Sequence, residues 1–167
     1  MYKNYFSFCI ILVLVFSRLI PHPPNFTPII AVSIMSGFLF KKFYWSIIVI
    51  LISMFLSDIF IGLYKNMFFV YLSLFAVCYI SYIKLIKFNY KNLLIYGFIG
   101  SITFFLISNF GVWLLGDLYT KNFNGLLNCY ILALPFFKNT LISTVFFSYI
   151  AFFVSNIYEK KTIFNLN

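Results

Sequence analysis

Charged residues are scarce in this chain. Only 9% of its 167 residues are charged and 63% are hydrophobic, against about 25% and about 45–50% in an ordinary soluble domain. A soluble domain needs polar side chains to cover its surface, whereas a helical bundle in lipid can be apolar outside as well as inside. The composition therefore excludes an ordinary soluble protein and predicts one integral membrane domain over residues 1–167.

Acidic and histidine residues are fewer still, with three acidic side chains and one histidine in the chain. They cannot supply a metal trio or a nucleophile–base–acid set, and the chain has no Gly-rich phosphate loop, so we expect no enzyme, metal or cofactor. The net charge of +9 comes from basic residues scattered between apolar runs and never forms a basic face. We therefore expect no nucleic-acid partner.

Cysteines are also few, and none forms a C-x-x-C pair or has a histidine nearby. Cys9, Cys78 and Cys129 all lie within apolar runs. We expect them to be small buried hydrophobic residues.

Long apolar runs dominate what is present: Tyr5–Ile20, Pro28–Phe40, Trp45–Tyr64, Met67–Ile83, Leu93–Leu115, Leu126–Phe137 and Thr140–Tyr158. A spanning helix needs about 20 residues, so Leu126–Phe137 is predicted to be a broken or re-entrant helix. Pro28–Phe40 crosses only if Lys41 and Lys42 lie in the headgroup zone. Tyr5–Ile20 lacks a small-x-small cleavage site and is predicted to be a retained helix. These runs predict an all-α polytopic bundle of about six transmembrane helices.

The basic residues sort by side in this topology. One larger set falls on the side of both termini: Lys3, Lys41, Lys42, Lys84, Lys87, Lys91, Lys160 and Lys161. Arg18, Lys65, Lys121 and Lys138 fall on the other. The positive-inside rule then predicts a bacterial cytoplasmic (inner) membrane protein with both termini in the cytoplasm.

Polar residues gather in the outer half of this topology, and we predict that they contact a ligand. The candidate ligand-binding residues are His22, Asn25, Thr27, Asp58, Asn109, Trp113, Asp117 and Asn139. His22 is the single histidine and is more consistent with a structural or ligand-contact role than with catalysis. The excess of aromatic residues reads as codon bias of an AT-rich genome and is given no functional weight.

The segment Pro21–Pro28 holds four of the five prolines and cannot be helical, because proline fixes its own φ and biases the preceding residue away from α. It is predicted to be a stiff outer loop. Thr27 before Pro28 fits an N-cap followed by proline at the first helical position. The positive end of the next helix would then face this loop and could hold an anionic or carbonyl group; a rigid connector explains the segment equally well.

Arg18 is the only arginine, and Asp58 lies inside an apolar run at a similar predicted depth. An ionised carboxylate there needs a partner or water, so an Arg18–Asp58 ion pair is predicted. The pair fits a structural clamp better than a ligand or proton site, although both remain open.

A polar stripe is predicted to face the outside. Asn109, Trp113 and Asp117 recur at i, i+4 and i+8 along one side of a helix, which suits either a small-molecule pocket or interfacial anchoring.

Pro135 is predicted to break the last apolar region near the outside, with Thr140 capping the final helix. A break at membrane depth is tolerated where it lines a cavity, although a simple outer turn fits nearly as well.

Four strings together resemble an uncharacterised family of small bacterial integral membrane proteins: Arg18-Leu-Ile-Pro-His-Pro-Pro-Asn-Phe-Thr-Pro28, Leu56-Ser-Asp58, Ser108-Asn-Phe-Gly-Val-Trp113 and Ala133-Leu-Pro-Phe-Phe-Lys-Asn-Thr140. The resemblance covers nearly the whole chain, and its most specific part reads R-x-x-P-H-P-P-N-F-T-P. It implies no activity.

More distantly, the size, six helices and outer polar cluster resemble the substrate-binding S components of energy-coupling-factor transporters. That resemblance implies uptake of a vitamin or similar metabolite, with a separate transmembrane coupling subunit and an ATPase pair as partners. S components usually carry a small-x-x-x-small pattern on the first helix, and the nearest equivalent here is Ser33-x-x-x-Gly37 on the second. The alternative function is a structural or assembly subunit that binds no ligand.

Overall fold

The computed structural model describes residues 2–40, 42–84 and 88–164. Its helices are α1 (Tyr2–Leu19), α2 (Ile29–Phe40), α3 (Phe43–Ile61), α4 (Met67–Lys84), α5 (Tyr90–Leu115) and α6 (Phe123–Phe164). Within the described residues no strand occurs, so the all-α prediction is confirmed. Lys41 and Lys87, which contribute to the predicted charge asymmetry, lie outside these ranges.

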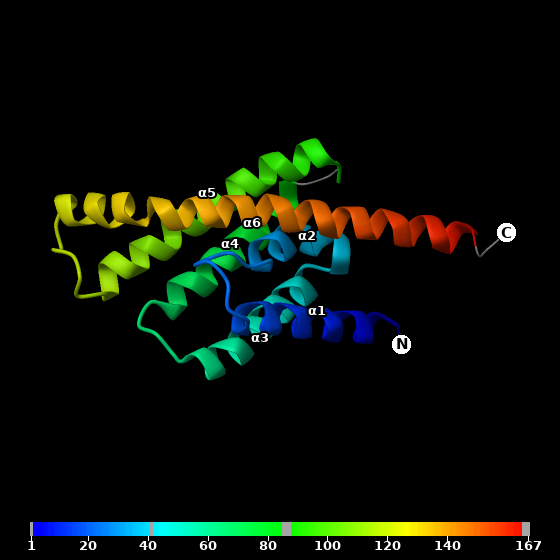
Figure 1. The fold of residues 1–167 in the computed structure, drawn as a ribbon, viewed down its shortest axis with the longest axis horizontal. Helices are drawn as coiled ribbons and strands as arrows, with labels where there is room; N and C mark the ends of the chain where they lie inside the picture. The colour runs from blue at the N-terminus through cyan, green and yellow to red at the C-terminus, as the bar shows by residue number, and fades with distance from the viewer. Residues whose placement is uncertain (1, 41, 85–87, 165–167) are drawn as a thin grey trace.

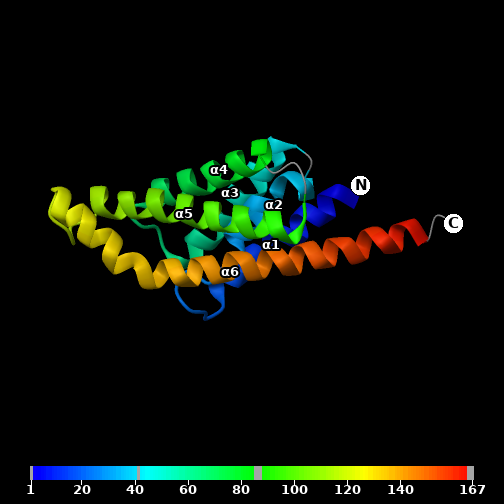
Figure 2. The ribbon, with the colours of Figure 1, turned by 90° about the horizontal axis from the view of Figure 1, so that it is seen from above.

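Successive helices run in alternating directions along the long axis of the molecule (Figures 1 and 2). Both ends of the chain lie toward one end of that axis. The connections α1–α2, α3–α4 and α5–α6, residues 20–28, 62–66 and 116–122, lie toward the other, which we call the loop end. The chain thus forms an up-and-down bundle.

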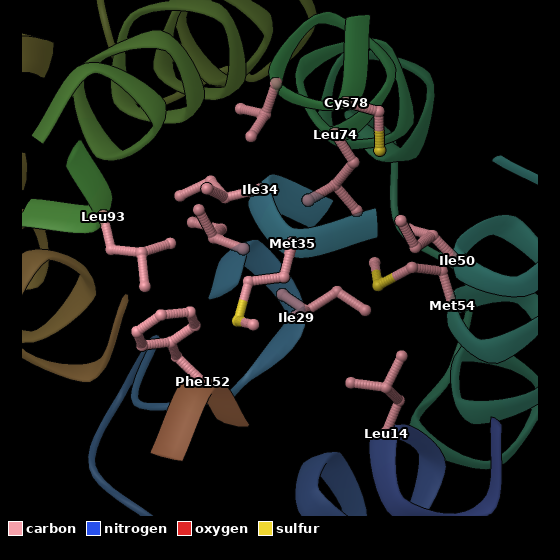
Figure 3. Close-up of a cluster of buried hydrophobic side chains, with 12 residues drawn as sticks. Leu14, Ile29, Ile34, Met35, Ile50, Met54, Leu74, Cys78, Leu93 and Phe152 are labelled. Atoms are coloured by element: carbon pink, nitrogen blue, oxygen red, sulfur yellow. The ribbon is translucent and has the colours of Figure 1, made fainter. Parts of the chain in front are cut away.

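Helix α2 lies at the centre of this bundle and packs against α3, α4, α5 and α6. Ile34 and Met35 of α2 are fully buried. Figure 3 shows them among side chains from α1, α3, α4, α5 and α6: Leu14, Ile50, Met54, Leu74, Cys78, Leu93 and Phe152. With 12 residues, α2 is about 18 Å long, shorter than the hydrocarbon layer of about 30 Å. Its continuous apolar character follows from burial on all sides.

Four helices are long and apolar enough to cross a membrane among the residues described: α3, α4, α5 and the Phe123–Asn156 part of α6. The apolar part of α1, Ser7–Leu19, is shorter. The exposed surface carries many large apolar side chains, such as Phe60 at 73% exposure. Such a surface suits lipid rather than water, so the chain has the character of a multi-pass membrane protein.

The interior, by contrast, contains many small hydroxyl residues. Ser33, Ser53 and Ser57 are fully buried, and each donates a hydrogen bond to a backbone carbonyl one turn earlier in its own helix. A hydroxyl satisfied in this way needs no partner on another helix, and its small size lets helices pack closely. Ser33 is therefore part of the packing inside the bundle rather than of an exposed docking face.

The predicted break in the last apolar region is absent. Helix α6 runs unbroken for 42 residues, with Pro135 inside it, so neither a broken nor a re-entrant helix precedes the last one. Thr140 is not a cap but an interior residue whose hydroxyl donates to the carbonyl of Phe136 at 2.9 Å. Proline removes one backbone hydrogen bond and bends a helix without necessarily ending it. Figure 2 shows the start of α6 at an angle to the remainder.

Two smaller expectations also need correction. Helix α2 begins at Ile29, and its first bond runs from Val32 N to the carbonyl of Pro28 at 2.9 Å. Pro28 therefore takes the cap position predicted for Thr27, and the helix starts one residue later than predicted. Cys78 and Cys129 are buried as expected, but Cys9 is exposed. It is exposed because α1 is a peripheral helix that packs mainly on α3.

Candidate functional site

Arg18 and Asp58 are in contact near the loop end. Nη2 of Arg18 lies 2.6 Å from Oδ1 of Asp58. Asp58 is fully buried in the last turn of α3, while Arg18, in the last turn of α1, keeps 15% of its side chain exposed. A buried carboxylate is costly without a partner. The pair therefore links the peripheral helix α1 to the centre of the bundle.

The rest of the guanidinium is also engaged on α3. Nη1 donates to the carbonyl oxygen of Met54 at 3.2 Å, lies 3.3 Å from the sulfur of the same residue, and donates to the hydroxyl of Ser57. A planar fork with several fixed donors can serve these acceptors and a carboxylate together, which a lysine ammonium on its flexible stem does less well. This geometry gives a physical reason for the single arginine of the chain.

Two tyrosines complete the surroundings of Asp58. The Tyr71 hydroxyl of α4 donates to Oδ2 at 2.7 Å, and the Tyr64 hydroxyl lies 3.5 Å from the same oxygen. Burial, with the nearby Asp58 charge, raises the pKa of Tyr64 to about 12, so its phenol is protonated at neutral pH. Oδ1 has the Arg18 charge beside it but no aligned hydrogen-bond donor among the described residues.

The proline-rich loop, residues 20–28, is fastened to α6. Asn139 Nδ2 donates to the carbonyl of Pro24 at 3.1 Å, and the Ser143 hydroxyl donates to the carbonyl of Asn25 at 3.3 Å. The ring of Phe26 lies 5.7 Å from that of Phe147 in an edge-to-face contact. Figure 2 shows this loop beside α6. The two hydrogen bonds use the loop's backbone and the ring contact uses Phe26, so none of these contacts involves the side chains of His22 and Asn25.

Asn25 holds the turn of this loop. Its φ is +61°, in the left-handed region, where asparagine is among the few non-glycine residues found routinely. The only non-glycine residue with positive φ in the described ranges thus lies in the most proline-rich part of the chain. The loop is held in one conformation by prolines, by this turn and by its bonds to α6.

A cavity of about 390 Å³ lies between this loop and the Arg18 cluster. It is lined by Arg18, His22, Asn25, Thr27, Ile29, Met54, Ile61, Tyr64, Val70, Leu74 and Phe104. The polar side chains come mostly from α1, the loop and the α3–α4 connection, and the apolar ones from α2 to α5. Ligand pockets typically measure about 300–1,000 Å³ and combine apolar walls with a few polar groups. The cavity has that size and composition.

The structure brings only part of the predicted ligand-binding set to this cavity. His22, Asn25 and Thr27 line it, Asp58 lies behind Arg18, and Asn139 supports the loop from outside. Asn139 lies in the interior of α6 rather than in the predicted break.

Asn109, Trp113 and Asp117 are elsewhere, with partners of their own. Asn109 Nδ2 donates to the carbonyl of Phe105 at 2.8 Å, one turn earlier on α5, and Trp113 Nε1 donates to the carbonyl of Thr120 at 2.9 Å. Asp117 forms an exposed ion pair with Lys65 at 2.6 Å. That contact lowers the pKa of the Asp117 carboxyl. Their predicted ligand contacts stay a prediction.

Several residues of the cavity and of the Asp58 surroundings carry no clear signal in the sequence. Tyr64 and Tyr71 do not stand out, because they are two of 13 tyrosines and an aromatic excess from codon bias carries no functional weight. A buried Asp58 needs donors besides Arg18, and this requirement is the one signal that could have indicated hydroxyls on neighbouring helices. Val70 and Phe104 are apolar residues among many, and only packing places them at the cavity.

The side chains at the cavity include groups that can bind a ligand. They offer a guanidinium already paired with a carboxylate, an imidazole, an amide and hydroxyls. Within the described ranges, no three His, Cys, Asp or Glu side chains gather into a group that could hold a metal ion.

Comparison with known proteins gives a family but no characterised relative. No curated protein and no solved structure matches the chain. One family description matches residues 2–165, which is nearly the whole length. The chain therefore belongs to DUF6580, a family of unknown function.

Proposed function

We propose that this protein is the membrane-embedded binding subunit for uptake of a small molecule, and that the ligand occupies the cavity at the loop end. The observation that carries the proposal is the cavity of about 390 Å³ between the fastened loop and Arg18. A concave site with a few polar groups on well-fastened elements suits selective binding of a small molecule.

The proposed orientation places the loop end outside. Lysines gather toward the end that holds both termini, so the positive-inside rule favours cytoplasmic termini, about six crossings and a bacterial inner membrane. The cavity would then open toward the side from which a nutrient arrives.

The resemblance to S components of energy-coupling-factor transporters supports a division of labour. This chain would bind a vitamin or similar metabolite, and a separate transmembrane coupling subunit with an ATPase pair would drive its release. The Ser33-x-x-x-Gly37 pattern does not suit docking of that subunit, because Ser33 is fully buried in a central helix. A lipid-facing helix such as α1 would have to provide the contact.

A structural or assembly subunit is the second candidate, and one observation favours it. Arg18 already has Asp58, Met54 and Ser57 as partners. A cluster satisfied by the protein alone can act as a clamp between helices without any ligand.

Co-extracted ligands distinguish the two functions. The wild type and Leu72→Trp are expected to purify with the same small molecule, detected by mass spectrometry, because Leu72 is 40% exposed on α4. Val70→Trp, on the same helix, places its ring in the cavity and is expected to lose that molecule. Equal or absent small-molecule content in all three would favour the clamp. Asn109→Ala and Trp113→Ala, in the same series, test the contacts predicted for α5.

A further inference from the structure

We propose that the ligand is an uncharged molecule with an amide-type polar head and an apolar body. This inference rests on the proposed function and adds the chemical class of the ligand. Its basis is the charge balance of the cavity, the donors and acceptors among its polar lining residues, and its apolar lining residues.

Charge balance excludes a strongly charged head. Asp58 neutralises Arg18 at 2.6 Å, and Oδ2 of Asp58 is occupied by Tyr71. A carboxylate ligand would place a second negative charge beside the pair, next to the fully buried Asp58 carboxylate, without a counter-charge of its own. A cationic ligand would meet both the guanidinium and the positive N-terminal end of α2, whose first residue, Ile29, lines the cavity.

The polar lining retains donors for a carbonyl oxygen. A guanidinium has five N–H groups, and the contacts of Arg18 with Asp58, Met54 and Ser57 use Nη1 and one side of Nη2. None of these contacts uses the Nε hydrogen, and Arg18 lines the cavity. A neutral carbonyl can accept from this group without disturbing the ion pair.

The polar lining also offers acceptors for an N–H group. His22 Nδ1 lies 2.7 Å from the carbonyl of Pro23, and because a carbonyl only accepts, this nitrogen donates. Nε2 of a neutral ring is then an acceptor. The side-chain oxygen of Asn25 is a second acceptor on the same loop, and both residues line the cavity. An amide, which carries a carbonyl and an N–H side by side, matches both sets of groups.

Much of the remaining lining is apolar. Ile29, Val70, Leu74 and Phe104 come from α2, α4 and α5 and line the cavity. Leu74 is fully buried. An aromatic or aliphatic body would replace water there, which is favourable for apolar surface. A small polar molecule without such a body would leave this apolar lining uncovered.

Matched probes test the head group. Benzamide, benzoate and benzylammonium share one ring and differ in charge, and binding to the full chain in detergent is measured by ligand-observed NMR. We expect benzamide to bind at least about tenfold more tightly than the other two. Benzoate or benzylammonium binding as tightly as benzamide, or no binding of any of the three, would overturn the proposed class.

A charge change reverses the expected order. In Asp58→Asn the guanidinium loses its counter-charge, so benzoate should bind more tightly than benzamide. An unchanged order in a folded variant would contradict the charge argument. If the variant does not fold, the order of affinities measured on the wild type still tests the charge argument. As a second variant, His22→Phe removes the ring acceptor and should weaken the binding of benzamide more than that of toluene.

The two proposals fail in different ways. If the wild type retains a natural ligand that Val70→Trp loses, and that ligand is charged, the proposed binding function is supported and the amide class is refuted. If no natural ligand co-purifies and no probe binds, both proposals are refuted.

Discussion

Two ion pairs in this molecule have the same length and different surroundings. Arg18–Asp58 and Lys65–Asp117 both measure 2.6 Å, but Asp58 is fully buried whereas Lys65 and Asp117 are 70% and 84% exposed. Exposed pairs are screened by water and contribute little. Because Lys65 lowers the pKa of Asp117, its small contribution is present at neutral pH and is lost as pH falls through that lowered pKa.

The buried pair should show strong coupling. We expect Arg18→Gln or Asp58→Asn alone to lower the free energy of unfolding by about 3–5 kcal/mol, because each leaves an uncompensated buried charge. The double variant should lose less than the sum of the two. Reversible unfolding in mixed micelles measures the three values.

Lys65→Gln and Asp117→Asn provide the control. Their effects on the free energy of unfolding should be small and additive. Additive effects of Arg18→Gln and Asp58→Asn would show that the buried pair contributes no coupling energy.

Helices α4 and α5 approach each other closely at one glycine. A Cβ atom added at Gly111 would lie 2.4 Å from Cβ of Phe69. Such an overlap involves an atom next to the backbone and cannot be relieved by turning a flexible side chain. The two helices must therefore separate if Gly111 is replaced.

Gly111→Ala should lower the free energy of unfolding by about 1–3 kcal/mol, as overpacking typically does. Gly97→Ala on the same helix is the matched control, because its nearest contact would be Cγ2 of Val145 at 3.3 Å. The smaller crowding there is offset by the better helix propensity of alanine. Thermal unfolding followed by circular dichroism compares them, and equal midpoints would refute close packing at Gly111.

At the scale of the whole molecule, the alternating helices separate two ends with different chemistry. The loop end carries the proline-rich loop, the cavity and the exposed Lys65–Asp117 pair. The termini lie at the other end (Figure 1). A bundle of this kind in a membrane exposes its two ends to different compartments.

Accessibility of single cysteines tests this orientation. In a background lacking Cys9, Cys78 and Cys129, Lys84→Cys should be protected from a membrane-impermeant maleimide in intact cells, and Leu118→Cys, at an 84% exposed position, should react. Lys84 is the last residue of α4 and Leu118 lies in the α5–α6 connection, so the two positions lie at opposite ends of the bundle. Labelling of both from the same side would contradict the six-crossing topology, and labelling of Lys84→Cys alone would invert it.

The amino-acid sequence alone determined the solvent and the class of structure. Apolar runs, scarce charge and the proline segment Pro21–Pro28 predicted a helical membrane bundle with a stiff loop, because hydropathy and proline geometry act locally. It also suggested the Arg18–Asp58 contact, because an isolated carboxylate at membrane depth needs a counter-charge.

Only the tertiary structure decided how these parts meet. Helix α6 continues through Pro135 because a proline bends a helix without having to end it where neighbouring helices support the chain, and no local signal reports that support. Tyr71 reaches Asp58 from another helix, and Trp113 bonds to Thr120 rather than facing the cavity. These partners depend on which helix faces pack together. Contacts between residues far apart in the chain determine that packing.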